Sequence, residues 1–234
     1  MIQIHSLAIG AFEEIEPFNS AFSPGHPKLR ITVDTEIEPR LPDARVLEVL
    51  AAEFPGLARH QCRAEEAAAG TRAGGTQILL IESDSSANQA HLLEHLTLEM
   101  LGTLDRRVRR LSGVTCAYAA PRQRNDVFVE CYEAESGGFA ARLAAEAMNA
   151  VLAGLPLTPL YSDAVRCARM LRWHDERAWT ARRLAKLLTL PLERAGGALE
   201  VLARAHLVEP ESYSMNFSGE PCYRTLGAGL AAAR

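Results

Sequence analysis

The sequence predicts an α+β fold in which helices cover one face of an antiparallel or mixed sheet. Residues 28–34 alternate polar and apolar side chains, which is typical of a half-buried strand. Residues 43–54 and 139–152 instead repeat apolar side chains at the spacing of an amphipathic helix. After residues 154–160, rich in glycine and proline, the pattern changes to short helices, so we expect a second and smaller unit.

Composition limits the classes of protein to consider. The chain has 234 residues, of which 48% are hydrophobic and 23% charged, so it can bury a sizeable core. Its net charge of -4 argues against a surface that coats nucleic acid. Five cysteines without a C-x-x-C pair predict free thiols, and neither a secretory leader nor a membrane-spanning apolar run is recognisable. We therefore expect a cytoplasmic protein.

The first part of the chain reads as strands followed by a helix. Residues 2–9 and 28–34 are predicted strands, joined by a proline-rich loop. Asp43 is placed to cap a helix that runs to Phe54, and Pro55-Gly56 ends that helix. Its buried side is predicted to carry Val46, Leu47 and Leu50.

Further strands and helices are predicted between residues 77 and 152. Residues 77–82 form a short apolar strand. A long helix, whose start Ser85 and Ser86 are expected to cap, runs to about Leu104. Residues 114–119 and 127–133 then form a hairpin, because a turn-like basic segment separates two strand patterns. Gly137-Gly138 is expected to start the alanine-rich helix that ends at residue 152.

The long helix carries the motif H-x-x-E-H at His91, Glu94 and His95. Side chains four residues apart lie one above the other on a helix, so His91 and His95 can bind one zinc ion. Glu94 lies on the same side, where a general base for a zinc-bound water belongs. The motif is the inverted form of the zinc-peptidase H-E-x-x-H pattern. Two histidines on an amphipathic helix can also be purely structural, and that interpretation stays open.

A catalytic zinc site needs a third protein ligand. We prefer Glu130, because it shares a strand face with Phe128 and Tyr132. The alternatives are Glu146 and the pair His60 and Cys62. Glu99 is eight residues beyond His91, roughly 12 Å along a helix, which is too far for the same ion. Glu99 is therefore expected to contact His95 outside the ligand set or to lie at the surface.

Several short motifs in this order resemble the N-terminal domain of cyanophycin synthetase over about residues 1–153. They are P-G-L-A-R-H-Q-C at 55–62, H-L-L-E-H with Leu98-Glu99 at 91–99, D-V-F-V-E-C-Y-E at 126–133 and Met148-Asn149. The helix, strand pair and helix are also similar to pitrilysin-type metallopeptidases. The residues between 74 and 89 form a longer insert than the synthetase pattern has, and no ATP-binding G-x-x-x-x-G-K-[ST] loop occurs.

The resemblance implies polymer binding and a zinc-dependent hydrolysis of an aspartate backbone that carries arginine side chains. It assigns His91 and His95 as zinc ligands and Glu94 as the base. Glu133, with Glu130, would then bind the guanidinium groups of the substrate. The missing ATP-binding loop excludes polymer synthesis by this chain.

Residues 161–226 resemble a winged helix-turn-helix unit, with residues 227–234 as a frayed tail. Asp163 is expected to cap a helix over residues 164–171, residues 179–188 form the second helix, and Pro191 opens the third. That third helix balances Arg194 and Arg204 against Glu193 and Glu200. Protein contact, in a homodimer, is therefore favoured over DNA binding.

Two classes of function follow from the sequence. The first is a zinc-dependent hydrolase of peptide-like amide bonds, acting on a polyamide or peptide substrate that bears arginine. The second is a non-catalytic polymer-binding or regulatory protein with a winged-helix module, such as a transcriptional regulator. Glu94 separates the two only weakly: hydrolysis needs its carboxylate, whereas binding could tolerate glutamine there.

Overall fold

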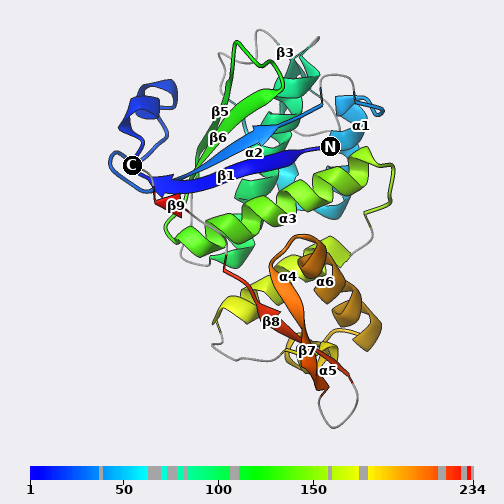
Figure 1. The fold of residues 1–234 in the computed structure, drawn as a ribbon. Helices are drawn as coiled ribbons and strands as arrows, with labels where there is room; N and C mark the ends of the chain where they lie inside the picture. The colour runs from blue at the N-terminus through cyan, green and yellow to red at the C-terminus, as the bar shows by residue number, and fades with distance from the viewer. Residues whose placement is uncertain are drawn as a thin grey trace.

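A computed structural model gives the fold in Figure 1 and confirms the predicted α+β class. The structure describes residues 1–36, 39–62, 70–72, 78–81, 84–105, 111–157, 160–173, 179–215, 220–227 and 231–232. A mixed sheet and two long helices form the larger part of the molecule. The elements from residue 160 onward lie beside it, and the chain then returns to the sheet (Figure 1).

The main sheet has the strand order β5-β6-β2-β1-β9. The strands are β1 (Gln3–Gly10), β2 (Lys28–Asp34), β5 (Gly113–Ala117), β6 (Arg124–Glu130) and β9 (Ala231–Ala232). All neighbouring pairs are antiparallel except β1 and β9, which run parallel. The predicted strand 28–34 and the predicted hairpin are both present, although β6 begins earlier than expected. A separate pair joins β3 (Gly70–Arg72) to β4 (Leu79–Ile81); residues 77 and 82 of the predicted strand lie outside the described residues.

Helices α2 (Ser85–Leu104) and α3 (Ala134–Leu152) cover one face of this sheet. Val127 and Val129 of β6 alternate toward them and belong to the main core. The intervening Phe128 faces the other side, where it packs with Ile15 of the 3-10 helix η1 (Glu13–Phe18). Alternation along β6 thus divides the sheet into a helix-covered face and a face covered at one end by η1.

The start of α2 is fixed by acidic side chains rather than by the predicted serine caps. Asp84 caps α2, because its Oδ1 accepts a hydrogen bond of 3.0 Å from the Ala87 amide. Asp43 does not cap α1 (Asp43–Glu53), whose N-cap is Pro42. Its carboxylate instead accepts hydrogen bonds from Ser85 (2.7 Å) and Asn88 (2.8 Å), which joins the first turns of α1 and α2. The predicted buried face of α1 is confirmed.

The C-terminal elements are three helices and a hairpin. They are α4 (Leu160–Trp173), α5 (Ala181–Leu188), α6 (Leu192–Arg204), β7 (Val208–Met215) and β8 (Pro221–Thr225). Trp179 forms an isolated antiparallel bridge with Tyr223 of β8. Helix α4 packs against α2, α3 and α6, so one continuous apolar core runs through both parts.

Further boundaries differ from the expectations. Helix α3 begins at Ala134, before the predicted start at Gly137-Gly138. The tail is not frayed at residues 231–232, because they pair with Ala8 and Ile9 of β1. Asp163 lies within the first turn of α4, which begins at Leu160 inside the predicted linker. Residues 158 and 159 of that linker lie outside the described part.

All five cysteines are free thiols, as predicted. Among the described helices, none combines the length and apolar character needed to cross a bilayer.

Candidate metal centre

Three metal-ligating side chains converge beside the middle of α2. The Sγ atom of Cys62 lies 3.5 Å from Nε2 of His91 and 3.4 Å from Nε2 of His95. The two Nε2 atoms are 3.0 Å apart. Their ligand atoms all lie within 4.8 Å of one another, so these residues can hold a metal ion.

The distances between these atoms fit one tetrahedral ion. Nitrogen and sulfur ligands bound to zinc at ~2.0 to 2.3 Å lie roughly 3.3 to 3.6 Å apart in a tetrahedron. The two separations that involve Cys62 fall in this range, and the histidine pair is slightly closer. Thiolate and imidazole are also the ligands that zinc prefers, and three protein ligands leave a fourth position open.

Local structure brings Cys62 to the helix. The 3-10 helix η2 (Pro55–Arg59) packs on α2 and ends immediately before His60 and Cys62. The contact is close at Gly56: a Cβ atom there would lie 1.7 Å from Oε1 of Glu99. Gly56 therefore lets η2 approach α2 closely enough for the thiol to reach the histidines.

A chain of contacts extends from the cluster to Glu99. Oε2 of Glu99 is 3.1 Å from Nε2 of His60, and Nδ1 of His60 is 3.2 Å from Nδ1 of His95. A carboxylate can only accept, so a neutral His60 ring donates from Nε2 and accepts at Nδ1. His95 must then donate from Nδ1, which leaves the lone pair of its Nε2 directed at the cluster. The contacts thus select the tautomer of His95 that can bind a metal.

The electrostatic environment keeps His95 neutral. Burial lowers its pKa well below the ordinary value of 6.5, and the neighbouring His91 and His60 lower the pKa further. Only neutral imidazole binds a metal, so this environment favours the ligand form of His95. Glu99, predicted to contact His95 outside the ligand set, reaches it through His60.

Glu94, the predicted general base, is buried next to β5. Its Oε2 atom accepts a hydrogen bond of 2.6 Å from the Thr115 hydroxyl. A Cβ atom at Gly113 would lie 2.7 Å from its Oε1, so β5 needs glycine there to leave room for the carboxylate. Thr115 and Gly113 therefore fix the orientation of Glu94, and the sequence analysis identified neither of them.

Glu130 is not brought to the histidines. Glu130 is two residues after Phe128 on β6, so both side chains point to the same face of the sheet. That face is the one opposite α2. Both carboxylate oxygens accept backbone amides there, from Ser23 (2.5 Å) and Ser112 (3.2 Å). The geometry therefore favours Cys62 over Glu130 as the third ligand.

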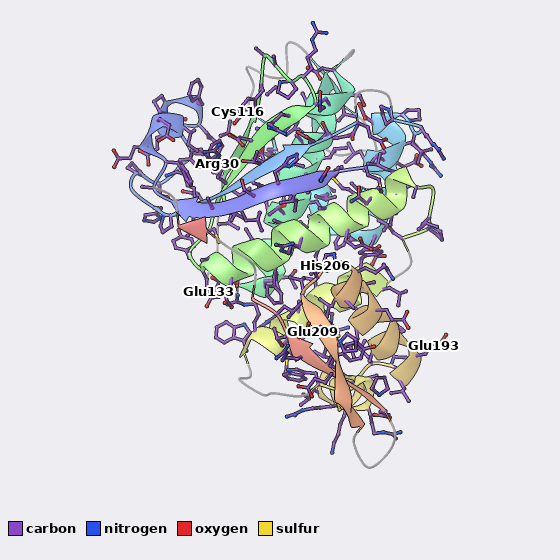
Figure 2. All side chains as sticks on the ribbon, viewed as in Figure 1. Arg30, Cys116, Glu133, Glu193, His206 and Glu209 are labelled. Atoms are coloured by element: carbon purple, nitrogen blue, oxygen red, sulfur yellow. The ribbon has the colours of Figure 1, made fainter. Side chains whose placement is uncertain are left out.

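The other predicted acidic residues lie toward α4 and α6. Glu133, labelled in Figure 2 at the start of α3, accepts a hydrogen bond from Ser136 and lies 3.0 Å from the Arg172 guanidinium. Glu146, an alternative ligand, pairs with Arg204 at 2.7 Å. The structure therefore does not bring either carboxylate to the cluster. His60 and Cys62, signalled by the H-x-C sequence after Pro55, supply what the sequence analysis left open.

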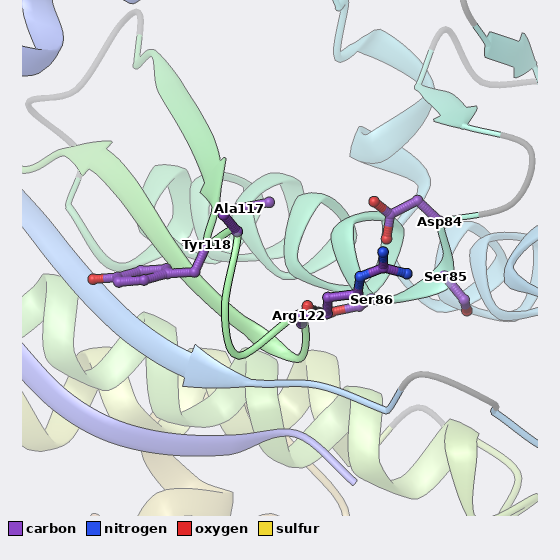
Figure 3. Close-up of a pocket in the computed structure, with 7 residues that line it drawn as sticks. Asp84, Ser85, Ser86, Ala117, Tyr118 and Arg122 are labelled. Carbon is purple, nitrogen blue, oxygen red and sulfur yellow. Dashed lines mark hydrogen bonds between the residues drawn. The ribbon is translucent and has the colours of Figure 1, made fainter.

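A cavity of about 370 Å³ lies at the N-terminal end of α2. The residues that line it come from the N-cap and first turn of α2, from the end of β5 and from the turn that follows β5 (Figure 3). They are Asp84, Ser85, Ser86, Ala117, Tyr118, Ala119 and Arg122. The cavity thus lies between the two elements that also position Glu94.

Comparisons with known protein families and with functionally characterised proteins found no match to this chain.

Proposed function

We propose that this protein is a zinc-dependent hydrolase of peptide-like amide bonds. The convergence of Cys62, His91 and His95 on one point carries this proposal. A zinc ion held by these three residues would supply a Lewis acid and would activate a water molecule. Glu94 is the general base in this scheme, and the substrate is a polyamide or peptide that bears arginine.

The surrounding residues support this assignment by fixing the reacting groups. Thr115 holds one oxygen of Glu94, so the carboxylate stays in one orientation beside β5. The chain from Glu99 through His60 holds the His95 ring and its tautomer. Such outer contacts are typical of metal sites in which ligand geometry matters for function.

The test compares metal content and hydrolysis in the wild type and in Glu94→Gln. Glutamine keeps the size and one acceptor but cannot take a proton. In Glu94→Gln, zinc content should stay near one ion per chain. The rate at which an aspartate-arginine polymer is shortened should fall by roughly 10²-fold or more. Glu48→Gln is the matched control, because Glu48 is an exposed carboxylate on α1 paired with Arg45.

Equal hydrolysis by the wild type, Glu94→Gln and chelator-treated protein would contradict the proposal. Polymer binding without any hydrolysis would instead favour the second class of function, a non-catalytic polymer-binding protein.

We also propose that the C-terminal helices and hairpin, which resemble a winged helix, mediate self-association rather than DNA binding. Most arginines described there already have a partner. Arg194 pairs with Asp163, Arg204 with Glu146 and Arg224 with Glu209. Arginines held by carboxylates are poorly placed to neutralise phosphates. Leu187 and Leu192, by contrast, are 46% and 49% exposed at the junction of α5 and α6.

The self-association proposal is tested with the double variant Leu187→Glu, Leu192→Glu. Sedimentation should show a dimer for the wild type and a monomer for the variant, because two buried carboxylates oppose an apolar interface. Phe18→Glu is the control, since Phe18 is an exposed apolar residue on η1. Tight duplex DNA binding with a steep salt dependence would overturn the preference for protein contact.

A further inference from the structure

The cavity at the start of α2 has a fixed wall. The Ser86 hydroxyl donates to the backbone carbonyl of Arg122 at 3.0 Å, and the amide of Thr35 donates to the carbonyl of Gln123 at 2.9 Å. Asn125 also donates to Ser86 Oγ at 3.2 Å. These hydrogen bonds hold the turn after β5 against α2 and against the end of β2, so the cavity is a built feature of the fold.

Arg122 differs from most arginines that the structure describes. Arg30, Arg124 and Arg172, for example, each lie within 3.0 Å of a carboxylate. The side chain of Arg122 has no such partner among the described residues, and it extends from the turn toward the first turn of α2 (Figure 3). An unpaired guanidinium that lines a cavity can form two parallel hydrogen bonds with a carboxylate.

Asp84 limits which anions the cavity accepts. Its carboxylate lines the same cavity and is held there as the cap of α2. One positive and one negative side chain leave the cavity nearly neutral, which disfavours a doubly charged group such as phosphate. A single carboxylate fits this pair of charges better than a doubly charged group does.

The cavity also lies close to the proposed catalytic residues. Ser85 precedes His91 by roughly 9 Å along α2, at ~1.5 Å for each residue. Ala117 follows Thr115 by roughly 7 Å along β5. These spans correspond to about two or three residues of an extended chain, at ~3.3 Å each.

We infer that the cavity at Asp84, Ser85 and Arg122 is a substrate subsite, and that Arg122 binds a carboxylate two or three residues from the amide bond at the metal centre. This inference rests on the proposed hydrolase function. It adds a specificity that the metal ligands cannot supply, because they contact only the group that reacts.

The experiment measures binding, so that it does not depend on turnover. The probes are the capped peptides acetyl-Gly-Asp-Gly-amide and acetyl-Gly-Asn-Gly-amide, titrated by calorimetry into zinc-loaded Glu94→Gln protein. The Glu94→Gln protein should bind the aspartate peptide roughly tenfold more tightly than the asparagine peptide. This is the usual scale for one charged hydrogen-bonded contact. Adding Arg122→Ala should abolish the preference, and Arg122→Lys should restore part of it.

Arg224→Ala is the matched control, because it removes one exposed positive charge from β8. It should keep the preference for the aspartate peptide. Equal affinity for the two peptides, or an equal loss in Arg224→Ala, would overturn the inference. Acetate that binds as tightly as the aspartate peptide would overturn the polyamide assignment.

The subsite and the hydrolase proposal can fail separately. A carboxylate preference that depends on Arg122 supports the subsite even if the wild type hydrolyses no polymer. Hydrolysis that depends on Glu94, with no preference between the peptides, overturns the subsite alone.

Discussion

Two polar regions of this protein, one around buried Asp163 and one around buried His95, are built on different principles. Between α4 and α6, Asp163 lies 2.6 Å from Arg194 and 3.3 Å from Arg166, so the negative charge is balanced within the protein. Beside α2, by contrast, Cys62, His91 and His95 direct a thiol and two imidazole nitrogens at one another. The first region is electrostatically complete, whereas the second offers three ligand atoms that can hold a metal ion.

The largest effect is expected when one ligand is removed from the cluster of Cys62, His91 and His95. His95→Ala should weaken zinc binding by roughly 10³-fold or more, because one of three protein ligands is lost. Zinc content and competition with a chromophoric chelator measure this. His5→Ala is the control, since His5 pairs with Asp34 at the opposite face of the sheet. Unchanged zinc content in His95→Ala would remove the contrast between the two regions.

A smaller loss of zinc affinity is expected when the residues that orient His95 are changed. His60→Ala and Glu99→Ala should each weaken zinc binding by roughly 10- to 100-fold, because the His95 tautomer is no longer selected. The stoichiometry at saturating zinc should not change. Equal affinities in wild type and both variants would show that the contacts from Glu99 to His95 serve packing alone.

A substitution at Asp163, in the ion-paired region, should change the free energy of unfolding but not the zinc affinity. Asp163→Ala should lower the free energy of unfolding by about 1 to 3 kcal/mol, since a buried hydrogen-bonded carboxylate is lost while Arg194 and Arg166 can still reach water. Denaturant titration measures this in metal-free protein. Reduced zinc affinity in Asp163→Ala would mean that the two regions are coupled through α4.

The smallest effect concerns pH in the metal-free protein. The pKa of His95 is lowered by burial, so the unfolded chain takes up a proton below about pH 6.5 that the folded chain does not. Stability is therefore full above this pH and falls as the pH decreases, by roughly 1 kcal/mol near pH 5.5. His95→Gln should remove that part of the dependence. A wild-type profile flat from pH 7.5 to 5.5 would contradict it.

Local patterns were sufficient for much of the fold. Alternation predicted β2 at residues 28–34, and helical spacing predicted the buried face of α1. The i, i+4 spacing also predicted that His91 and His95 would share a face of α2. These features depend on neighbours within a few residues, which the sequence displays directly.

Long-range placement was the part that the sequence could not provide. Glu130 and Cys62 were both reasonable third ligands, and only the pairing of β6 with its neighbours shows that Glu130 faces away from α2. Asp43 had the position of a cap, yet it contacts residues more than forty positions away in α2. Thr115 gave no local signal, because its partner Glu94 belongs to another element.

The pairing of residues 231–232 with β1 has a consequence for synthesis of the protein. Strand β1 is made first, yet its outer edge receives its partner only after β8 has left the ribosome. Until then the backbone groups of Ala8 and Ile9 are open to strands from other chains. A nascent or C-terminally shortened chain is therefore expected to aggregate through this edge, and a fusion attached after residue 232 would crowd it.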